Sequence, residues 1–312
     1  MQIQATPSLV QRPTLAARSA AAPAAPKPDY PVDTPGEPAW GTSLTGDIRY
    51  HQVESPSLGN SRGVWVYLPP DYFQQPDKHF PVLYALDGQN VFEKGTAFGG
   101  TEWGMDEAAQ EHMLKGDMKD AIIVAVSNAG ADRTNEYTPV ADPNHGGGQA
   151  DKFTHFLVDE LKPMIDTRYR TTQDPDETGI LGSSLGGLYS LYAHVHHPEV
   201  FGLCGAMSPS IWWANKEILS DIAATPAPKD PGHVWLSMGT AEDPDDVDPN
   251  GVPEVIDNTR AVVSLLEHEG YQEGKNLTYR EIPGGQHNEA SWSRQIGDAL
   301  VDLYPNQGNL AA

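Results

Sequence analysis

The sequence contains very little cysteine. Among its 312 residues Cys204 is the single thiol, so no disulfide can form within the chain. Cys204 lies in the apolar stretch VFGLC, which predicts a buried, unreactive thiol rather than a nucleophile. A small disulfide-stabilised fold and a cysteine-dependent catalyst are therefore not expected. A single cysteine does not indicate whether the protein works in an oxidising or a reducing compartment.

Long hydrophobic runs and basic residues are also scarce. No apolar run approaches the roughly 18 residues that a membrane-spanning helix needs, so insertion into a membrane is not expected. Lys and Arg number 20 against 43 Asp and Glu, which makes the net charge -23. A surface with this charge repels phosphate groups, so neither nucleic acid nor an anionic membrane is an expected partner. A mean hydropathy of -0.47 fits a soluble globular protein.

The first 44 residues differ in composition from all that follow. They are rich in Ala and Pro and lack sustained periodicity, which is typical of a disordered arm or linker. No basic start precedes an apolar stretch there, so a signal peptide is not predicted and the cytoplasm is favoured. Residues 45–312 have a length that suits one α/β domain. Their pattern does not predict an oligomeric state.

Apolar runs typical of buried strands alternate with segments of helical periodicity along this domain. Such alternation predicts an α/β fold, with a doubly wound, mostly parallel sheet that carries helices on both faces. The strands are expected within residues 62–70, 79–88, 120–128, 177–182, 233–240 and 277–285, and the helices within 147–170, 184–197, 254–270 and 289–304.

The stretch GSSLG at residues 182–186 has the form of a nucleophile elbow, G-x-S-x-G, with Ser184 at its centre. An elbow requires that the serine end a strand and begin a helix, and the predicted elements place Ser184 at such a junction. The helix N-terminus beneath it favours developing negative charge. The alternative is a glycine-rich turn without chemistry.

A serine nucleophile needs a histidine base and an orienting carboxylate, because its hydroxyl is too weakly acidic to attack unaided. In α/β-hydrolases the chain order is Ser, acid, His, with the acid and His in loops after later strands. Of the eleven histidines, His287 alone matches that position, just before the last helix. The loop after the strand predicted within 233–240 offers several acids, namely Glu242, Asp243, Asp245 and Asp246.

An oxyanion hole needs two backbone N–H donors. One comes from the residue after the nucleophile, here Leu185, and the other from a loop after an earlier strand. The stretch YALDGQNVF contains such a loop, in which Gly88 allows close backbone approach and Gln89 supplies the N–H. A plain turn at Asp87 and Gly88 is the alternative.

Six motifs in order resemble the esterase D and enterochelin-esterase-like branch of the α/β-hydrolases over roughly residues 48–308. They are LDGQNVF, GADRTNEYTP, DELKPMIDTRYRT, GSSLGGLYSLY, MSPSIWW and GGQHNEASW. The resemblance implies carboxylic-ester hydrolysis without a cofactor, in a branch that includes feruloyl and acetyl esterases, siderophore trilactone hydrolases and mycolyl transferases.

Carried over residue by residue, the resemblance assigns the site. Ser184 matches the nucleophile and His287 the base, and the oxyanion donors match Gln89 and Leu185. The acid of the branch lies one residue after G-T-x, which points to Glu242.

The expected function is that of a serine esterase for a small or medium ester of the acetyl, short acyl or feruloyl type. Its partner is then a small-molecule ester. An acyltransferase of the same fold would share the acyl-serine intermediate and differ in the acceptor that is admitted. A non-catalytic binding module is disfavoured because it would not need all three triad residues. Triscatecholate siderophores rank low, because they are strongly anionic and the chain lacks an obvious basic cluster.

Four further residues are candidates for substrate contact. Arg133 and Tyr137 follow a predicted strand end and could line the cleft, with a structural ion pair between Arg133 and Glu136 as the alternative. Trp103 and Trp212 could wall a pocket, with core packing as the alternative.

The acidic loop at 246–257 has spacing close to that of a calcium loop. Counted from Asp246, oxygen-bearing residues occupy positions 1, 3, 5, 9 and 12, and glycine occupies position 6. Asp257 stands at position 12 in place of the longer Glu, and Pro249 and Pro253 restrict the backbone. A solvated acidic turn is therefore the favoured interpretation, with structural calcium as the alternative. No metal is expected at the catalytic site.

Overall fold

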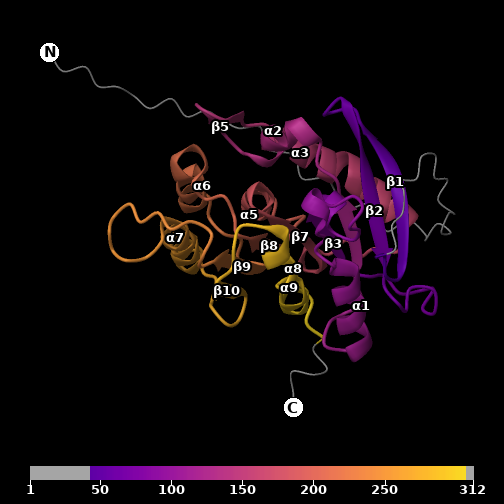
Figure 1. Cartoon of the computed structure of the whole chain (residues 1–312). Helices are drawn as coiled ribbons and strands as arrows, with labels where there is room; N and C mark the ends of the chain where they lie inside the picture. The colour runs from indigo at the N-terminus through magenta and orange to yellow at the C-terminus, as the bar shows by residue number, and fades with distance from the viewer. Residues whose placement is uncertain (1–42, 307–312) are drawn as a thin grey trace.

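The computed structural model describes residues 43–306 and contains an eight-stranded sheet in the order β1-β2-β4-β3-β7-β8-β9-β10 (Figure 1). The predicted arm at 1–44 lies outside the described residues except for its last two. The strands of the sheet are β1 (Asp47–Ser55), β2 (Asn60–Leu68), β3 (Val82–Leu86), β4 (Ile122–Val126), β7 (Thr178–Ser183), β8 (Leu203–Met207), β9 (His233–Gly239) and β10 (Leu277–Ile282).

Most of the sheet is parallel. Strands β4, β3, β7, β8, β9 and β10 pair in parallel, whereas β2 pairs antiparallel with both β1 and β4. Every residue of β3, β4, β7 and β8 is buried, as continuous apolar runs predict for strands covered on both faces. The predicted doubly wound α/β fold is confirmed. A separate two-stranded sheet joins β5 (Ala141–Asp142) to β6 (Gly146–Gly147).

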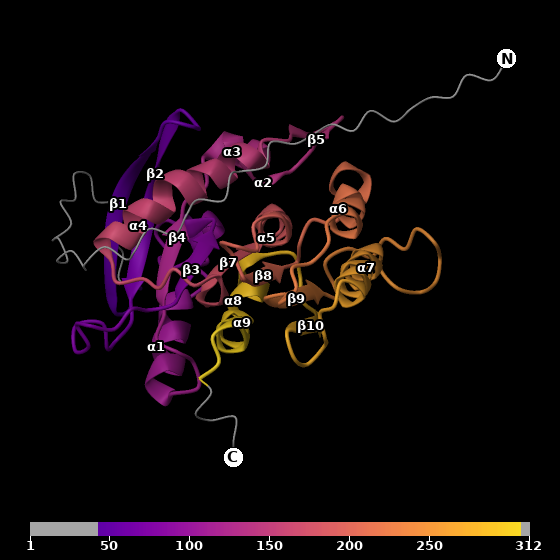
Figure 2. The same cartoon turned by 180° about the vertical axis from the view of Figure 1, so that it is seen from behind.

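Helices cover both faces of the sheet, and Figures 1 and 2 show the two layers from opposite sides. On one face the core includes α1 (Met105–Lys115), α8 (Glu289–Ser293) and α9 (Ile296–Leu303). The other face is covered by the segment α3–η4–α4 and by three further helices. Their bounds are α3 (Ala150–His155), η4 (Phe156–Leu161), α4 (Lys162–Arg168), α5 (Leu185–His196), α6 (Trp213–Ala224) and α7 (Glu254–His268).

Two predicted helices differ in detail from the structure. The segment expected as one helix over 289–304 divides into α8 and α9. The break follows from Gln295, whose N–H donates to the Trp292 carbonyl three residues back and whose side-chain amide donates to the Ser291 carbonyl. The helix expected within 147–170 contains the π-helical turn η4 at its centre. Helices α1 and α6 were not predicted.

No helix within residues 43–306 combines the length and the apolar character required to cross a membrane.

Candidate active site

Ser184 lies at a sharp turn between strand β7 and helix α5. Its backbone adopts φ 58° and ψ -121°, a strained conformation for a residue other than glycine. The flanking glycines are needed because the turn brings them together, and a Cβ on Gly182 would lie 2.6 Å from the carbonyl carbon of Gly186. The elbow therefore holds Ser184 above the carboxyl edge of the sheet at the N-terminus of α5.

Ser184, His287 and Glu242 form a continuous chain of hydrogen bonds. The Oγ of Ser184 lies 2.8 Å from Nε2 of His287, and Nδ1 of His287 lies 2.7 Å from Oε2 of Glu242. A carboxylate only accepts, so Nδ1 carries the proton and Nε2 accepts the serine hydroxyl. In this arrangement the imidazole can take the Ser184 proton while Glu242 stabilises the imidazolium.

The loops that carry the acid and the base are joined to each other. Glu242 follows β9 and His287 follows β10, and the N–H of Ala241 donates to the Gly285 carbonyl at 2.9 Å. A Cβ on Gly239 would lie 2.4 Å from that same carbonyl oxygen, so only glycine permits this approach. The loop that carries Glu242 therefore lies directly against the loop that carries His287.

The other acids of this loop do not reach His287. Asp243 accepts the N–H of Asp245 at 3.0 Å. The carboxylate of Asp246 accepts the N–H groups of Asn250 and Gly251 at 3.1 and 2.8 Å. These carboxylates bond within their own loop, whereas Glu242, with a side chain only 4% exposed, is the acid that bonds to His287.

The loop after β3 has the form expected of an oxyanion loop. Asp87 adopts a left-handed conformation with φ 53°, and Gly88 lies so close to β4 that a Cβ would be 2.5 Å from the backbone of Ala125. The Gln89 side chain accepts the N–H of Asn128 at 3.2 Å. Within the described chain no acceptor is bonded to the backbone N–H of Gln89 or of Leu185.

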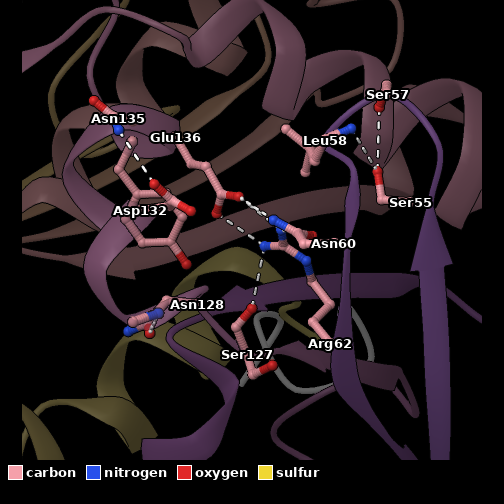
Figure 3. A network of polar contacts seen from close by, with 12 residues as sticks. Ser55, Ser57, Leu58, Asn60, Arg62, Ser127, Asn128, Asp132, Asn135 and Glu136 are labelled. Carbon is pink, nitrogen blue, oxygen red and sulfur yellow. Dashed lines mark hydrogen bonds and ion pairs between the residues drawn. The ribbon is translucent and has the colours of Figure 1, made fainter.

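Arg133 bonds to the loop after β3, and the alternative of an ion pair with Glu136 is not found. Arg133 Nε and Nη2 donate to the two carboxylate oxygens of Asp87, each at 2.7 Å. Glu136 instead accepts from Arg62 of β2 at 2.7 and 3.0 Å, a buried pair in which Asn60 also takes part (Figure 3). Helix α2 (Arg133–Tyr137) thus links the loop after β3 to strand β2.

Two of the four proposed substrate contacts are wrong, because their side chains are inaccessible. Tyr137 is fully buried and accepts the N–H of Asp87 at its hydroxyl, and Trp103 is 1% exposed and packs edge-on against Trp292. Trp212, in contrast, is 48% exposed. It follows Ser210, whose Oγ lies 3.3 Å from that of Ser184, so Trp212 stays a candidate for substrate contact.

The calcium interpretation of residues 246–257 is not supported. Asp246 uses its carboxylate on backbone N–H groups, and Asp257 accepts the side-chain amide of Asn250 at 2.7 Å. In the part of the chain that the structure describes, no group of three or more His, Cys, Asp or Glu side chains is placed to hold a metal ion. The acidic turn is the better description of this loop.

Several residues near the site had no predicted role. Ser208 donates to Glu242, and Trp292 packs edge-on against the ring of His287 with 5.0 Å between ring centroids. Both lie in the motifs MSPSIWW and GGQHNEASW, which offered the only signal for them. Cys204 is fully buried and burial raises the pKa of its thiol, so the predicted inert cysteine fits the structure.

The family of the chain follows from comparison with known proteins. The model of the family described as putative esterase matches residues 55–303. The chain belongs to this putative esterase family. It is therefore a carboxylic ester hydrolase, as its motifs predicted.

Relatives of the putative esterase include bacterial proteins of similar and greater length. The uncharacterized protein YbbA of Bacillus subtilis is 27% identical over 273 residues, which cover 84% of this chain and 97% of YbbA. The iron(III) enterobactin esterase of Dickeya dadantii is 30% identical over 196 residues, which cover 60% of this chain and 40% of that protein. The enterobactin esterase FES of Shigella flexneri superposes with a TM-score of 0.65 at 20% identity over 86% of this chain and 62% of that one, which shows the shared fold.

Proposed function

We propose that the chain cleaves esters through an acyl-serine intermediate formed at Ser184. His287 accepts the Ser184 proton as the oxygen attacks the carbonyl, and it then donates that proton to the leaving alcohol. Glu242 orients His287 and stabilises the imidazolium. The N–H groups of Leu185 and Gln89 bind the oxyanion. The hydrogen-bonded chain from Ser184 to Glu242 carries this proposal.

The proposed substrate is an uncharged ester with a small or medium acyl group, of the acetyl, short acyl or feruloyl type. The net charge of -23 opposes the approach of strongly anionic substrates. Arg133, a cation close to the site, is already paired with Asp87. Arg133 therefore offers no unpaired positive charge to a triscatecholate. Trp212 could contact the acyl or the alcohol part.

The test compares the two adjacent serines with p-nitrophenyl acetate and longer acyl esters. Ser184→Ala is expected to lower kcat by about 10⁴-fold or more, because it removes the nucleophile. Ser183→Ala is the matched control, since Ser183 is buried at 1% exposure and makes no bond to His287, and it should keep most of the activity. Comparable turnover in both variants would refute the proposal.

Product analysis in the presence of added alcohols separates hydrolysis from acyl transfer. Free acid as the main product supports the hydrolase, and transfer to the added alcohol supports the acyltransferase. A burst of p-nitrophenol equal to the enzyme concentration marks the acyl-enzyme that both reactions share. Methyl ferulate and acetylated sugars, tested alongside, define the acyl and alcohol preference.

A further inference from the structure

Ser208 lies in a second hydrogen-bonded chain that leads to Glu242. It directly follows β8, is 1% exposed, and has φ 46°, a left-handed conformation that is costly for a residue with a side chain. Its N–H donates to the Ser237 carbonyl on the neighbouring strand β9 at 2.8 Å. The sheet thus holds Ser208 in a strained conformation next to the site.

The direction of the hydrogen bonds at Ser208 is determined by chemistry. The indole N–H of Trp292 donates to the Ser208 Oγ at 2.9 Å, and an indole nitrogen can only donate. The Ser208 hydroxyl must accept there, so its own proton is available for Oε1 of Glu242, 2.5 Å away. The chain therefore runs from Trp292 to Ser208 and on to Glu242.

The same contacts determine which carboxylate oxygen serves His287. Oε1 of Glu242 accepts from Ser208 and also from the N–H of Gly239 at 2.9 Å, and Oε2 accepts from His287. The last torsion of a glutamate side chain is broad, so the carboxylate plane needs fixed donors to keep one orientation. With Oε1 bonded twice, Oε2 is the oxygen that faces the imidazole.

We propose that Ser208 is a positioning residue for Glu242, with its hydroxyl oriented by Trp292. This inference rests on the proposed function. Trp292 serves both ends of the arrangement, since its ring packs against His287 and its N–H sets the Ser208 hydroxyl. The strained backbone at Ser208 is then explained, because it directs the hydroxyl at the acid.

The first experiment uses Ser208→Gly, which removes the hydroxyl and relieves the positive φ, so the fold is retained. We expect kcat for p-nitrophenyl acetate to fall by about 30-fold while KM stays within about twofold, because substrate binding does not involve Glu242. Ser237→Ala is the matched control. Its hydroxyl is buried on the adjacent strand and has no partner in the described chain, so its kcat should be unchanged.

A second variant tests the indole N–H of Trp292 separately from its aromatic ring. Trp292→Phe keeps an aromatic ring beside His287 and removes the N–H, which frees the Ser208 hydroxyl to rotate. A loss of kcat smaller than that of Ser208→Gly is expected. An unchanged kcat in Ser208→Gly would overturn the proposal, and so would a loss that appears only as a raised KM.

A double-mutant cycle provides the deciding readout. In a Glu242→Gln enzyme the orientation of the acid no longer matters, so Ser208→Gly should change kcat by less than about twofold further. An equal loss in both backgrounds would show that Ser208 acts independently of Glu242 and would refute the assignment. If Ser184→Ala is inactive and Ser208→Gly fully active, only the positioning role fails. If Ser184→Ala retains turnover, the proposed function fails first.

Discussion

At the scale of single residues, burial and partners separate side chains of identical type. Ser183 is buried in β7, Ser184 bonds to His287, and Ser208 bonds to Glu242. The acids of the following loop differ in the same way, because Glu242 is buried against the base and Asp243 bonds to its own loop. The chemistry of each side chain is therefore set by its neighbours.

This contrast yields a prediction for the acid. Glu242→Gln should lower kcat by about 10²-fold or more with little change in melting temperature, because a neutral amide cannot stabilise the imidazolium. Asp243→Asn is the matched control and should keep kcat within about twofold, since its bond to Asp245 does not involve the base. Steady-state kinetics and thermal melts provide the measurement. If the Glu242→Gln enzyme has normal activity and the Asp243→Asn enzyme is inactive, Asp243 and not Glu242 is the acid that orients His287.

At the scale of elements, the start of α1 contains a buried acid that fastens the segment before β1. Asp106 is fully buried, and its Oδ2 accepts the N–H of Thr45 at 2.7 Å. Burial raises the pKa of Asp106 well above its ordinary value, and the adjacent Glu107 carboxyl adds to this effect. The folded state therefore binds a proton that the unfolded chain releases at lower pH.

The sign of the resulting pH dependence follows from proton linkage. Where the folded state binds more protons than the unfolded state, stability falls as the pH rises, here from about pH 4 up through the raised pKa. We expect the melting temperature to fall between about pH 5 and about pH 9, and Asp106→Asn to flatten this slope. The amide oxygen that this substitution introduces would still accept the Thr45 N–H. Equal slopes in both proteins, measured by thermal melts across the pH series, would contradict the assignment.

The element scale also shows where sequence patterns were informative. Continuous apolar runs predicted β3, β4 and β9, because a strand buried on both faces has no polar side to interrupt the run. Helix α1 was not predicted, although three of its four buried residues are apolar. Its first turn carries the acids Asp106 and Glu107, and the burial of Asp106, whose carboxylate accepts the N–H of Thr45, arises only from tertiary contact.

At the scale of the whole molecule, the net charge of -23 is the dominant electrostatic feature. Self-repulsion among exposed carboxylates destabilises the compact state, and salt screens it over a Debye length of about 10 Å at 0.1 M. We therefore expect the melting temperature to rise by several degrees between about 0.02 M and about 0.5 M NaCl. KCl at matched ionic strength should give the same rise, because screening does not depend on the cation. A melting temperature that stays constant or falls with added salt would show that charge repulsion does not limit the stability of the protein.

Order along the chain and local pattern determined the α/β fold and the candidates Ser184, Glu242 and His287. The elbow is a local pattern, in which a strand is followed by a glycine-flanked serine and then a helix. The acid and the base follow from chain order, because loops after successive parallel strands meet at the carboxyl edge of the sheet. Because these rules do not depend on where side chains lie in space, they can be applied to the sequence alone.

Only the tertiary structure decided which side chains touch. It placed Arg133 on Asp87 rather than on Glu136, buried Tyr137 and Trp103, and joined Ser208 to Glu242. Such pairings depend on register between strands and on how loops from distant elements pack, and a shift of one residue reverses the face on which a side chain lies. No local pattern contains that information, because it arises when the packed core selects one arrangement of the whole chain.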